Sequence, residues 1–306
     1  MGTPDFAVHS LDILYNAGYE IVGVITSRDR YGGRGRKTLI ESDLKKYAIS
    51  KQLKILQPTN LKNPEFVEEL RTLKADIQVV VAFRMLPVVV WDMPPMGTYN
   101  LHGSLLPKYR GAAPINWAII KGENITGVTS FKLKHEIDTG SILIQREIPI
   151  YPNDNAGDLH DRMKYVAADV VLESVNLIES GDFELKEQND NAVTHAPKLK
   201  NENTRIDFNM DVVDVLNFIR GLDPYPSAWM KLGGKKMKVK KAKASEKFIG
   251  QDHDIISDNK NFISLKCNDG YIELHQLQYE GKRTMNVKEF LNGFDISGMA
   301  IMPGVS

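Results

Sequence analysis

Short runs of apolar, mostly β-branched residues alternate with amphipathic stretches along the first third of the chain. Residues 20–26 and 76–83 are predicted buried strands, and residues 54–56 and 97–101 are further predicted strands. The predicted helices are residues 6–17, 43–53 and 64–74. Strands and helices that alternate at this spacing predict an α/β domain with a doubly wound, mostly parallel, Rossmann-like sheet. Ligands of such sheets bind at the carboxyl ends of the strands. We therefore expect the ligand site at the segments that follow residues 82 and 100.

The rest of the chain has a different pattern. Residues 126–133 and 141–150 are predicted antiparallel strands and residues 155–180 a long helix, which completes a first domain expected at 1–182. Residues 183–204 are polar and predict a linker. In the remaining part, 205–306, a helix at 210–222 is followed by short strands at 228–232, 236–242, 261–267 and 271–278. This order predicts a small C-terminal β-barrel of the oligonucleotide-binding (OB-like) type.

Composition narrows the class of protein. The chain has 306 residues, of which 42% are hydrophobic and 25% charged, which is ordinary for a globular protein with more than one domain. Cys267 is the single cysteine, so an intrachain disulfide and a cysteine-rich zinc site are excluded. The chain has no apolar run of about 20 residues and does not open on a basic-then-apolar leader. We therefore expect a cytoplasmic protein without a membrane span.

Charge is balanced overall but unevenly distributed. Lys and Arg together number 39, as do Asp and Glu. Residues 27–38 nevertheless carry five cations (Arg28, Arg30, Arg34, Arg36 and Lys37) against Asp29 alone. Residues 235–247 hold seven lysines, of which Lys236, Lys238 and Lys240 alternate with Met237 and Val239. A solvated loop and a charged edge strand are the alternative readings, but two basic elements in a neutral chain favour contact with a phosphate backbone.

Residues 100–111, NLHGSLLPKYRG, carry the strongest candidate chemistry. Asn100 and His102 lie two residues apart where a predicted strand runs into a loop, so their side chains point to the same face. Residues 104–107 are kept extended by Pro107, and we expect their unpaired backbone groups to bracket a flat ligand. The alternative for an isolated Asn-x-His is a buried pair that satisfies loop backbone.

The sequence NLHGSLLPKYRGAAPINWAI resembles the core signature of the folate-dependent formyltransferases, and HEIDTG at 135–140 resembles the acidic loop of that family. Three further stretches, MGTPDFA at 1–7, GGRGRK at 32–37 and LDPYPSAW at 222–229, resemble the branch that formylates an aminoacyl-tRNA. The resemblance covers essentially the whole chain. The family has a short apolar strand before the Gly-Thr-Pro turn, and here the chain begins at the turn, so we expect an open place in the middle of the sheet. The basic loop also opens with Ser-Arg-Asp-Arg-Tyr, where the family more often has Pro-Asp-x-Pro.

The resemblance implies 10-formyltetrahydrofolate as the formyl donor and methionyl-initiator tRNA as the acceptor, for the initiation of translation. The implied catalytic residues are Asn100, His102 and Asp138. The implied folate-binding residues are Ser104, Leu105, Leu106 and Pro107. Phe83, Met85 and Leu86 lie at and just after the end of the predicted strand at 76–83, and we expect them to bind the folate too, because a pterin ring needs flat apolar walls. Ordinary core packing is the alternative for these three.

The resemblance implies that the loop with Arg34, Arg36 and Lys37 binds the tRNA, with Arg34 as its main contact. The charge pattern adds Lys236, Lys238 and Lys240 as predicted tRNA-binding residues. We expect a monomer. We also expect no metal, because the other histidines lack ligand spacing.

These residue types fit formyl transfer. A donor pair such as Asn100 and His102 suits the oxyanion of a tetrahedral intermediate, and a carboxylate such as Asp138 suits the proton that the amine must lose. No Ser or Cys stands beside a base as a nucleophile, so no covalent intermediate is expected. The alternatives are another folate-dependent N-formyltransferase, with glycinamide ribonucleotide or a nucleotide sugar as acceptor, a hydrolase that releases formate from the same folate, and a non-catalytic RNA-binding protein.

Overall fold

The computed structural model describes residues 1–32, 35, 37–246 and 253–298. The chain folds into two compact units. Unit 1 comprises Met1–Pro114, Ile125–Pro149 and His160–Ala196, and unit 2 comprises Ile115–Asn124, Ile150–Leu159 and Pro197–Ser306. Each unit has a sheet of its own, and each is described separately below.

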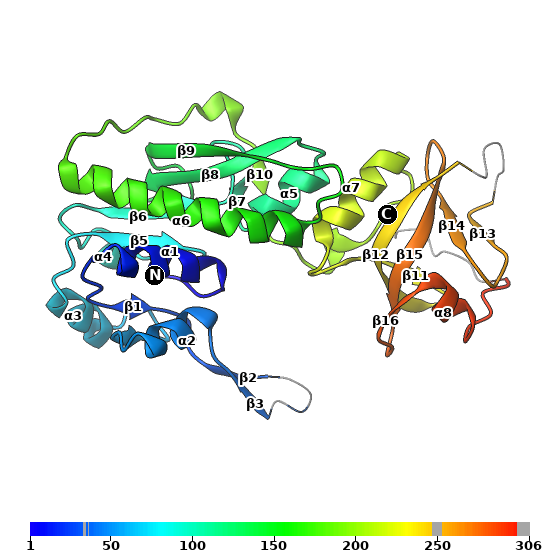
Figure 1. Ribbon diagram of the computed structural model, residues 1–306, viewed down its shortest axis with the longest axis horizontal. Helices are drawn as coiled ribbons and strands as arrows, with labels where there is room; N and C mark the ends of the chain where they lie inside the picture. The colour runs from blue at the N-terminus through cyan, green and yellow to red at the C-terminus, as the bar shows by residue number, and fades with distance from the viewer. Residues whose placement is uncertain (33–34, 36, 247–252, 299–306) are drawn as a thin grey trace. The chain divides into compact units, whose positions relative to one another are not determined.

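Unit 1 is built on four strands in the order β5-β6-β8-β9 (Figure 1). These strands are β5 (Gln78–Val81), β6 (Thr98–His102), β8 (Ile125–Lys132) and β9 (Ile142–Pro149). β5 and β6 are parallel, whereas β8 and β9 run antiparallel to their neighbours. A second parallel pair is formed by β1 (Val24–Ile25) and β4 (Ile55–Leu56). The strands confirm the predicted α/β domain with parallel pairing at its centre.

The first two residues lie between β1 and β5. Gly2 N–H donates to the Ile25 carbonyl at 3.0 Å, and Val81 N–H donates to the Met1 carbonyl at 2.9 Å. Gly2 also forms a parallel bridge with Val81. The place in the sheet that was expected to be open is therefore occupied by the backbone of these two residues, which links the two parallel pairs.

Helices cover both faces of this sheet. They are α1 (Phe6–Asn16), α2 (Asp43–Ser50), α3 (Pro64–Thr72), α4 (Val88–Trp91) and α6 (Ala156–Ser180). Val171, Val175 and Ile178 of α6 pack over β5, β6 and β8. Phe66 and Leu70 of α3 belong to a buried cluster with residues of β1, β4 and β5. The doubly wound arrangement follows, because each face buries apolar surface against a helix.

Local signals set the starts of two of these helices. The Ser42 side chain caps α2 by accepting from Lys45 N–H, and the Asn63 side chain caps α3 by accepting from Glu65 N–H. Pro64 occupies the first turn of α3, where a missing N–H costs nothing. Between β1 and α2 the basic segment forms an unpredicted hairpin, β2 (Arg30–Gly32) and β3 (Thr38–Ile40).

Residues 186–196, here named the strap, belong to unit 1, although they fall within the expected linker of residues 183–204. Lys186 pairs with Ile142 of β9. Further along, β10 (His195–Ala196) runs parallel to β7 (Arg110–Gly111), and a short 3-10 helix η1 (Asp190–Ala192) lies between. The strap thereby contacts the segment that follows His102. A second 3-10 helix, η2 (Glu202–Thr204), follows in unit 2.

Unit 2 contains a curled antiparallel sheet in the order β11-β12-β15-β14-β13, with β16 pairing on β15. Its elements are α5 (Pro114–Ile120, shared with unit 1), α7 (Val212–Leu222), β11 (Ala228–Leu232), β12 (Lys235–Ser245), β13 (Ile255–Ser257), β14 (Ile263–Lys266), β15 (Tyr271–Tyr279), β16 (Thr284–Asn286) and α8 (Val287–Leu291). Met237, Val239 and Phe290 lie in its core. Within the described residues the expected barrel is thus an open half-barrel. No helix in the described ranges is long and apolar enough to span a bilayer.

Candidate active site

Strand β6 carries Asn100 and His102 to the end of the sheet in unit 1. Asn100 is paired with Val80 of β5 and Phe131 of β8, and His102 with Thr129 of β8. His102 is buried, whereas Asn100 is half-buried. Within the described part of the chain, the Asn100 side-chain amide makes no hydrogen bond, so its N–H groups are available to a ligand.

The two ring nitrogens of His102 face different partners. Nε2 lies 2.8 Å from the Tyr109 carbonyl oxygen. A carbonyl only accepts, so Nε2 carries the hydrogen and donates it. Nδ1 lies 3.8 Å from Asp138 Oδ2, and both side chains are about nine-tenths buried. The bond to Tyr109 fixes the ring and leaves Nδ1 as the nitrogen that is available for chemistry.

Asp138 is held in a strained turn. Its φ is 55°, in the left-handed region that non-glycine residues rarely adopt. Oδ2 accepts a hydrogen bond of 2.9 Å from Gly111 N–H. Gly111 has a φ of 128°, and a Cβ atom there would lie 2.6 Å from the Ala196 carbonyl oxygen of the strap. The left-handed conformation of Asp138 costs roughly 1–3 kcal/mol. It persists only where surrounding contacts impose it, as functional sites often require.

The loop of residues 104–107 is anchored from behind by two polar side chains of β8 and β9. Thr129 Oγ1 is fully buried, donates to the Ser104 carbonyl at 2.6 Å and accepts from Leu106 N–H at 3.1 Å. Gln145 Nε2 donates to the Leu106 carbonyl at 2.8 Å. The expectation that these backbone groups are free for a ligand is therefore wrong for Ser104 and Leu106. A single Thr and a single Gln form no motif, so neither residue could be recognised as an anchor from the sequence.

The strap contributes a second anchor, Gln188. Its Nε2 donates to the carbonyls of Asp138 and Gly140, each at 2.8 Å. Its Oε1 accepts from Arg110 Nε at 3.0 Å and from a terminal nitrogen of that guanidinium at 2.7 Å. Arg110 also donates to Asp190, whose side chain is 84% exposed. Gln188 therefore joins the turn that carries Asp138 to the segment that carries Gly111.

A pocket of about 680 Å³ opens beside the carboxyl end of β5. It is lined by Thr59, Asn60, Leu61, Lys62, Arg84, Met85, Leu86, Pro87, Val88, Val89, Trp91 and His135. Met85 is 66% exposed, which is unusual for a large apolar side chain. The volume is that of a small-molecule site, with an apolar wall and cations at its edge. Met85 and Leu86 of the predicted folate-binding set line it. Phe83 does not line it but lies beneath the Arg84 guanidinium, 5.7 Å from ring centroid to Cζ.

The predicted tRNA-binding residues lie in the segment between β2 and β3 and on strand β12. Arg34 and Arg36 lie outside the described residues, while Lys37 is exposed just before β3. In unit 2, Lys236 Nζ lies 4.2 Å from the ring centroid of Trp229, and burial lowers the pKa of Lys236. Lys238 is half-buried on the same face of β12.

Lys240 forms an ion pair with a buried carboxylate. Its Nζ lies 3.1 Å from Asp223 Oδ1, with side chains that are 14% and 11% exposed. The charge of Lys240 therefore already compensates a buried carboxylate. Beyond a bulge in β12, Lys241 and Lys243 are exposed, and neither was among the predicted tRNA-binding residues.

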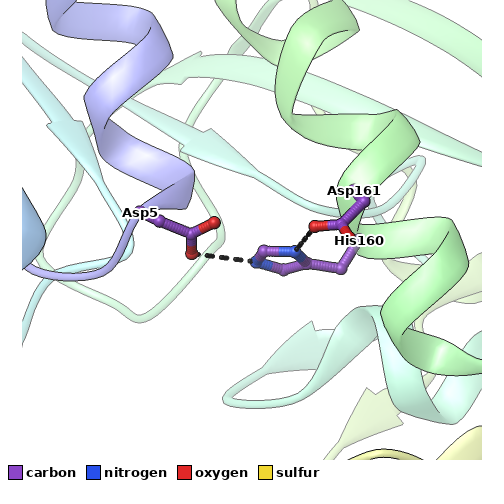
Figure 2. A group of neighbouring side chains, drawn as sticks. All are labelled: Asp5, His160 and Asp161. Atoms are coloured by element: carbon purple, nitrogen blue, oxygen red, sulfur yellow. Dashed lines mark hydrogen bonds and ion pairs between the residues drawn. The ribbon is translucent and has the colours of Figure 1, made fainter.

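Outside this site, one group in the described ranges has the spacing of metal ligands: Asp5, His160 and Asp161 (Figure 2). His160 Nε2 lies 3.7 Å from Asp5 and Nδ1 lies 3.2 Å from Asp161. The two ring nitrogens therefore face different carboxylates rather than one shared point. Lys164 Nζ lies 3.4 Å from Asp5 and 3.1 Å from Asp161, and its hydrogen bond lowers the pKa of Asp161. The geometry is that of an ion-pair network between α1 and α6.

The chain is similar to formyltransferases over nearly its whole length. Residues 1–175 match the family model described as formyl transferase, and residues 198–295 match its C-terminal domain. A protein of Parabacteroides distasonis named methionyl-tRNA formyltransferase is 47% identical over 96% of this chain and 94% of its own length. A protein of the same name from Flavobacterium johnsoniae is 46% identical over 98% of this chain and 96% of its own.

Two solved structures share the fold. An N-formyltransferase from Helicobacter canadensis, in complex with folinic acid and dTDP-3-aminofucose, has a TM-score of 0.69 at 23% identity and covers 90% of this chain and 97% of its own. HypX from Aquifex aeolicus, in complex with tetrahydrofolic acid, has a TM-score of 0.60 at 23% identity and covers 80% of this chain and 44% of its own. At such identities the likeness concerns the fold alone.

Proposed function

The chain belongs to the formyltransferase family, and we propose that it transfers the formyl group of 10-formyltetrahydrofolate to the α-amino group of methionyl-initiator tRNA. Relatives at 46–47% identity over at least 96% of this chain carry the name methionyl-tRNA formyltransferase. The observation that carries the proposal is the arrangement of His102 and Asp138. The Nε2 bond of His102 fixes the ring, so that Nδ1 lies beside the Asp138 carboxylate. Within the described residues the neighbouring Asn100 amide makes no side-chain hydrogen bond.

The residues of the site have defined roles in this reaction. The neutral amine of the methionyl group attacks the formyl carbon, and the carbonyl oxygen becomes an oxyanion. The Asn100 amide and a protonated Nδ1 of His102 donate to that oxyanion, because preorganised donors stabilise the developing charge. Asp138 accepts the proton that the amine loses, directly or through water. The bond from the formyl carbon to N10 of the folate then breaks, and N10 takes up a proton.

The donor would lie along the pocket beside β5 and the loop after His102. The pterin and benzoyl rings need flat apolar walls, which Met85 and Leu86 supply. The contribution of Phe83 to folate binding would be indirect, because the Arg84 guanidinium covers its ring. Thr129 and Gln145 already hydrogen-bond the backbone of the loop after His102. The proposed contacts of Ser104, Leu105, Leu106 and Pro107 with the donor would therefore depend on the shape of this loop.

The acceptor is a large anion and needs contacts far from the chemistry. Lys37, together with Arg34 and Arg36, would bind the phosphate backbone at unit 1, and Lys236 and Lys238 would do so at unit 2. The contribution of Lys240 to tRNA binding would be indirect, because its ammonium group is paired with Asp223. We place the reaction in the cytoplasm, where protein synthesis begins, with the chain acting as a monomer.

A formyl-transfer assay tests the proposal. The purified chain is incubated with 10-formyltetrahydrofolate labelled in the formyl group, and with methionyl-initiator tRNA, glycinamide ribonucleotide or a nucleotide-linked amino sugar in parallel. Label is expected on the methionyl-tRNA alone. Label on one of the small amines instead would reassign the acceptor, and formate release without transfer would make the chain a hydrolase.

A further inference from the structure

The basic hairpin of β2 and β3 exposes an apolar pair that the proposed function does not use. Tyr31 and Leu39 are opposite each other in the register of the hairpin. Their side chains are 68% and 49% exposed. On the other face, Ile40 lies over Gly32, which has no side chain of its own. One face of the hairpin therefore carries a bare aromatic ring and a leucine.

The base of the hairpin is closed by polar contacts, so the pair is presented on an anchored element. The hydroxyl groups of Thr26 and Ser42, before and after the loop, are 2.7 Å apart. Lys45 of α2 is hydrogen-bonded to Asp29 at the start of the loop, and its Nζ lies 2.6 Å from Glu41 at the end. Hydrogen bonding to Lys45 lowers the pKa of Asp29, which keeps the start of the loop charged and bound.

The surroundings of the ring indicate what could cover it. Arg28, Arg30 and Lys37 are exposed on the same loop, so the surface attracts an anion rather than a purely apolar partner. A partner that offers flat apolar faces and negative charge together is a nucleic acid. Proteins that bind single-stranded or unpaired RNA stack its bases on Tyr, Phe or Trp among cationic side chains.

We propose that the Tyr31 ring stacks on an unpaired nucleobase of the tRNA, with Leu39 supporting the ring from the opposite strand. The inference rests on the proposed function and adds to it a base contact beside the phosphate contacts of the loop. Stacking adds affinity without neutralising a phosphate. The contribution of Tyr31 is therefore insensitive to salt, unlike that of Lys37.

The test measures the dissociation constant of methionyl-initiator tRNA over a series of KCl concentrations. The Tyr31→Ala variant is expected to bind about 5- to 150-fold more weakly at every concentration, with an unchanged slope of log K against log salt. The Lys37→Ala variant should instead lower that slope by about 0.7–0.9. Tyr31→Phe should bind as the unaltered chain does, and Tyr31→Leu should bind like Tyr31→Ala, because leucine is apolar but cannot stack.

Controls separate this contact from general damage. Tyr165→Ala removes another exposed tyrosine of unit 1, from α6, and should leave tRNA binding unchanged. The KM for the folate donor should stay constant in all variants, which shows that the site is intact. Unaltered binding by Tyr31→Ala or by Tyr31→Leu overturns the stacking contact, as does a change of oligomeric mass in Tyr31→Ala without a change in tRNA affinity. Failure of the unaltered chain to bind tRNA would overturn the tRNA part of the proposed function instead.

Discussion

His102 Nδ1 lies 3.8 Å from Asp138 Oδ2, while Nε2 of the same ring donates to the Tyr109 carbonyl. The imidazole is thus fixed in one orientation with one nitrogen still available. If Nδ1 donates to the oxyanion of the transferred formyl group, its loss removes transition-state stabilisation without removing donor binding.

We therefore expect His102→Ala to lower kcat by about 10²–10³-fold while the dissociation constant of the folate donor changes little. Initial rates of formyl transfer and equilibrium binding of the donor measure the two quantities. His275→Ala, a substitution of a partly exposed histidine in unit 2, is the control and should leave both unchanged. A turnover of His102→Ala close to that of the unaltered chain would refute the oxyanion role.

Gln188 is expected to act as a positioning residue for Asp138. Gln188→Glu keeps the size of the side chain and the contact with Arg110 but cannot donate to the carbonyls of Asp138 and Gly140. Both Gln188→Glu and Gln188→Ala should reduce kcat by roughly 10- to 100-fold with a much smaller change in the KM for the donor. Asp190→Ala removes only an exposed partner of Arg110 and should be near neutral. Equal losses in kcat and in thermal stability for all three variants would argue for a purely structural role.

Thr129 should stabilise unit 1 through its hydroxyl. Thr129→Val leaves Leu106 N–H and the Ser104 carbonyl without their partner and should lower the free energy of unfolding by about 1–3 kcal/mol. Thr129→Ser restores the hydroxyl and should recover most of the loss. Thr126 on the same strand is the matched control, since its buried hydroxyl has no partner among the described residues. Urea unfolding should show Thr126→Val to be neutral or stabilising, and equal destabilisation by both valines would contradict the assignment.

Lys45 is predicted to orient the basic hairpin, because it contacts both Asp29 and Glu41 at the base of the loop. Lys45→Met should raise the KM for methionyl-initiator tRNA roughly two- to tenfold and leave the KM for the folate donor unchanged. Lys46→Met is the control, since Lys46 is exposed and, among the residues that the structure describes, pairs with exposed Asp43 alone. An increase in the KM for the donor would show that Lys45 supports the fold rather than the loop.

Cys267 should be inert in the folded chain. Its side chain is buried, and burial raises the pKa of the thiol to about 12, with a further contribution from Asp269. Below pH 9 the thiol is protonated in the folded state and largely protonated in the unfolded state, whose minor thiolate fraction is the form that reacts with alkylating reagents. As the pH rises above 9 toward 12, only the unfolded state ionises, so this group destabilises the fold progressively. Alkylation with iodoacetamide at pH 8 should therefore become fast only on unfolding, and rapid labelling of the native chain would contradict the burial.

The family resemblance read from the motifs is confirmed by the relatives at 46–47% identity. The order of helices and strands is also confirmed for most of the chain. β5, for example, lies within the predicted strand at 76–83, and α7 lies within the predicted helix at 210–222. These features were predictable because apolar periodicity, caps and turns are local and repeat over several residues.

What the sequence determined by itself was most of the helices and strands, the two basic segments, the motif that holds Asn100 and His102, and the separate motif that holds Asp138. Only the tertiary structure placed Gln188 against Asp138, Thr129 behind the loop after His102, and Met1 and Gly2 between β1 and β5. Each of these contacts joins single residues that are far apart in the chain. A lone polar residue has no period and no motif, so its role is decided by the register of the strands and by the path of the strap.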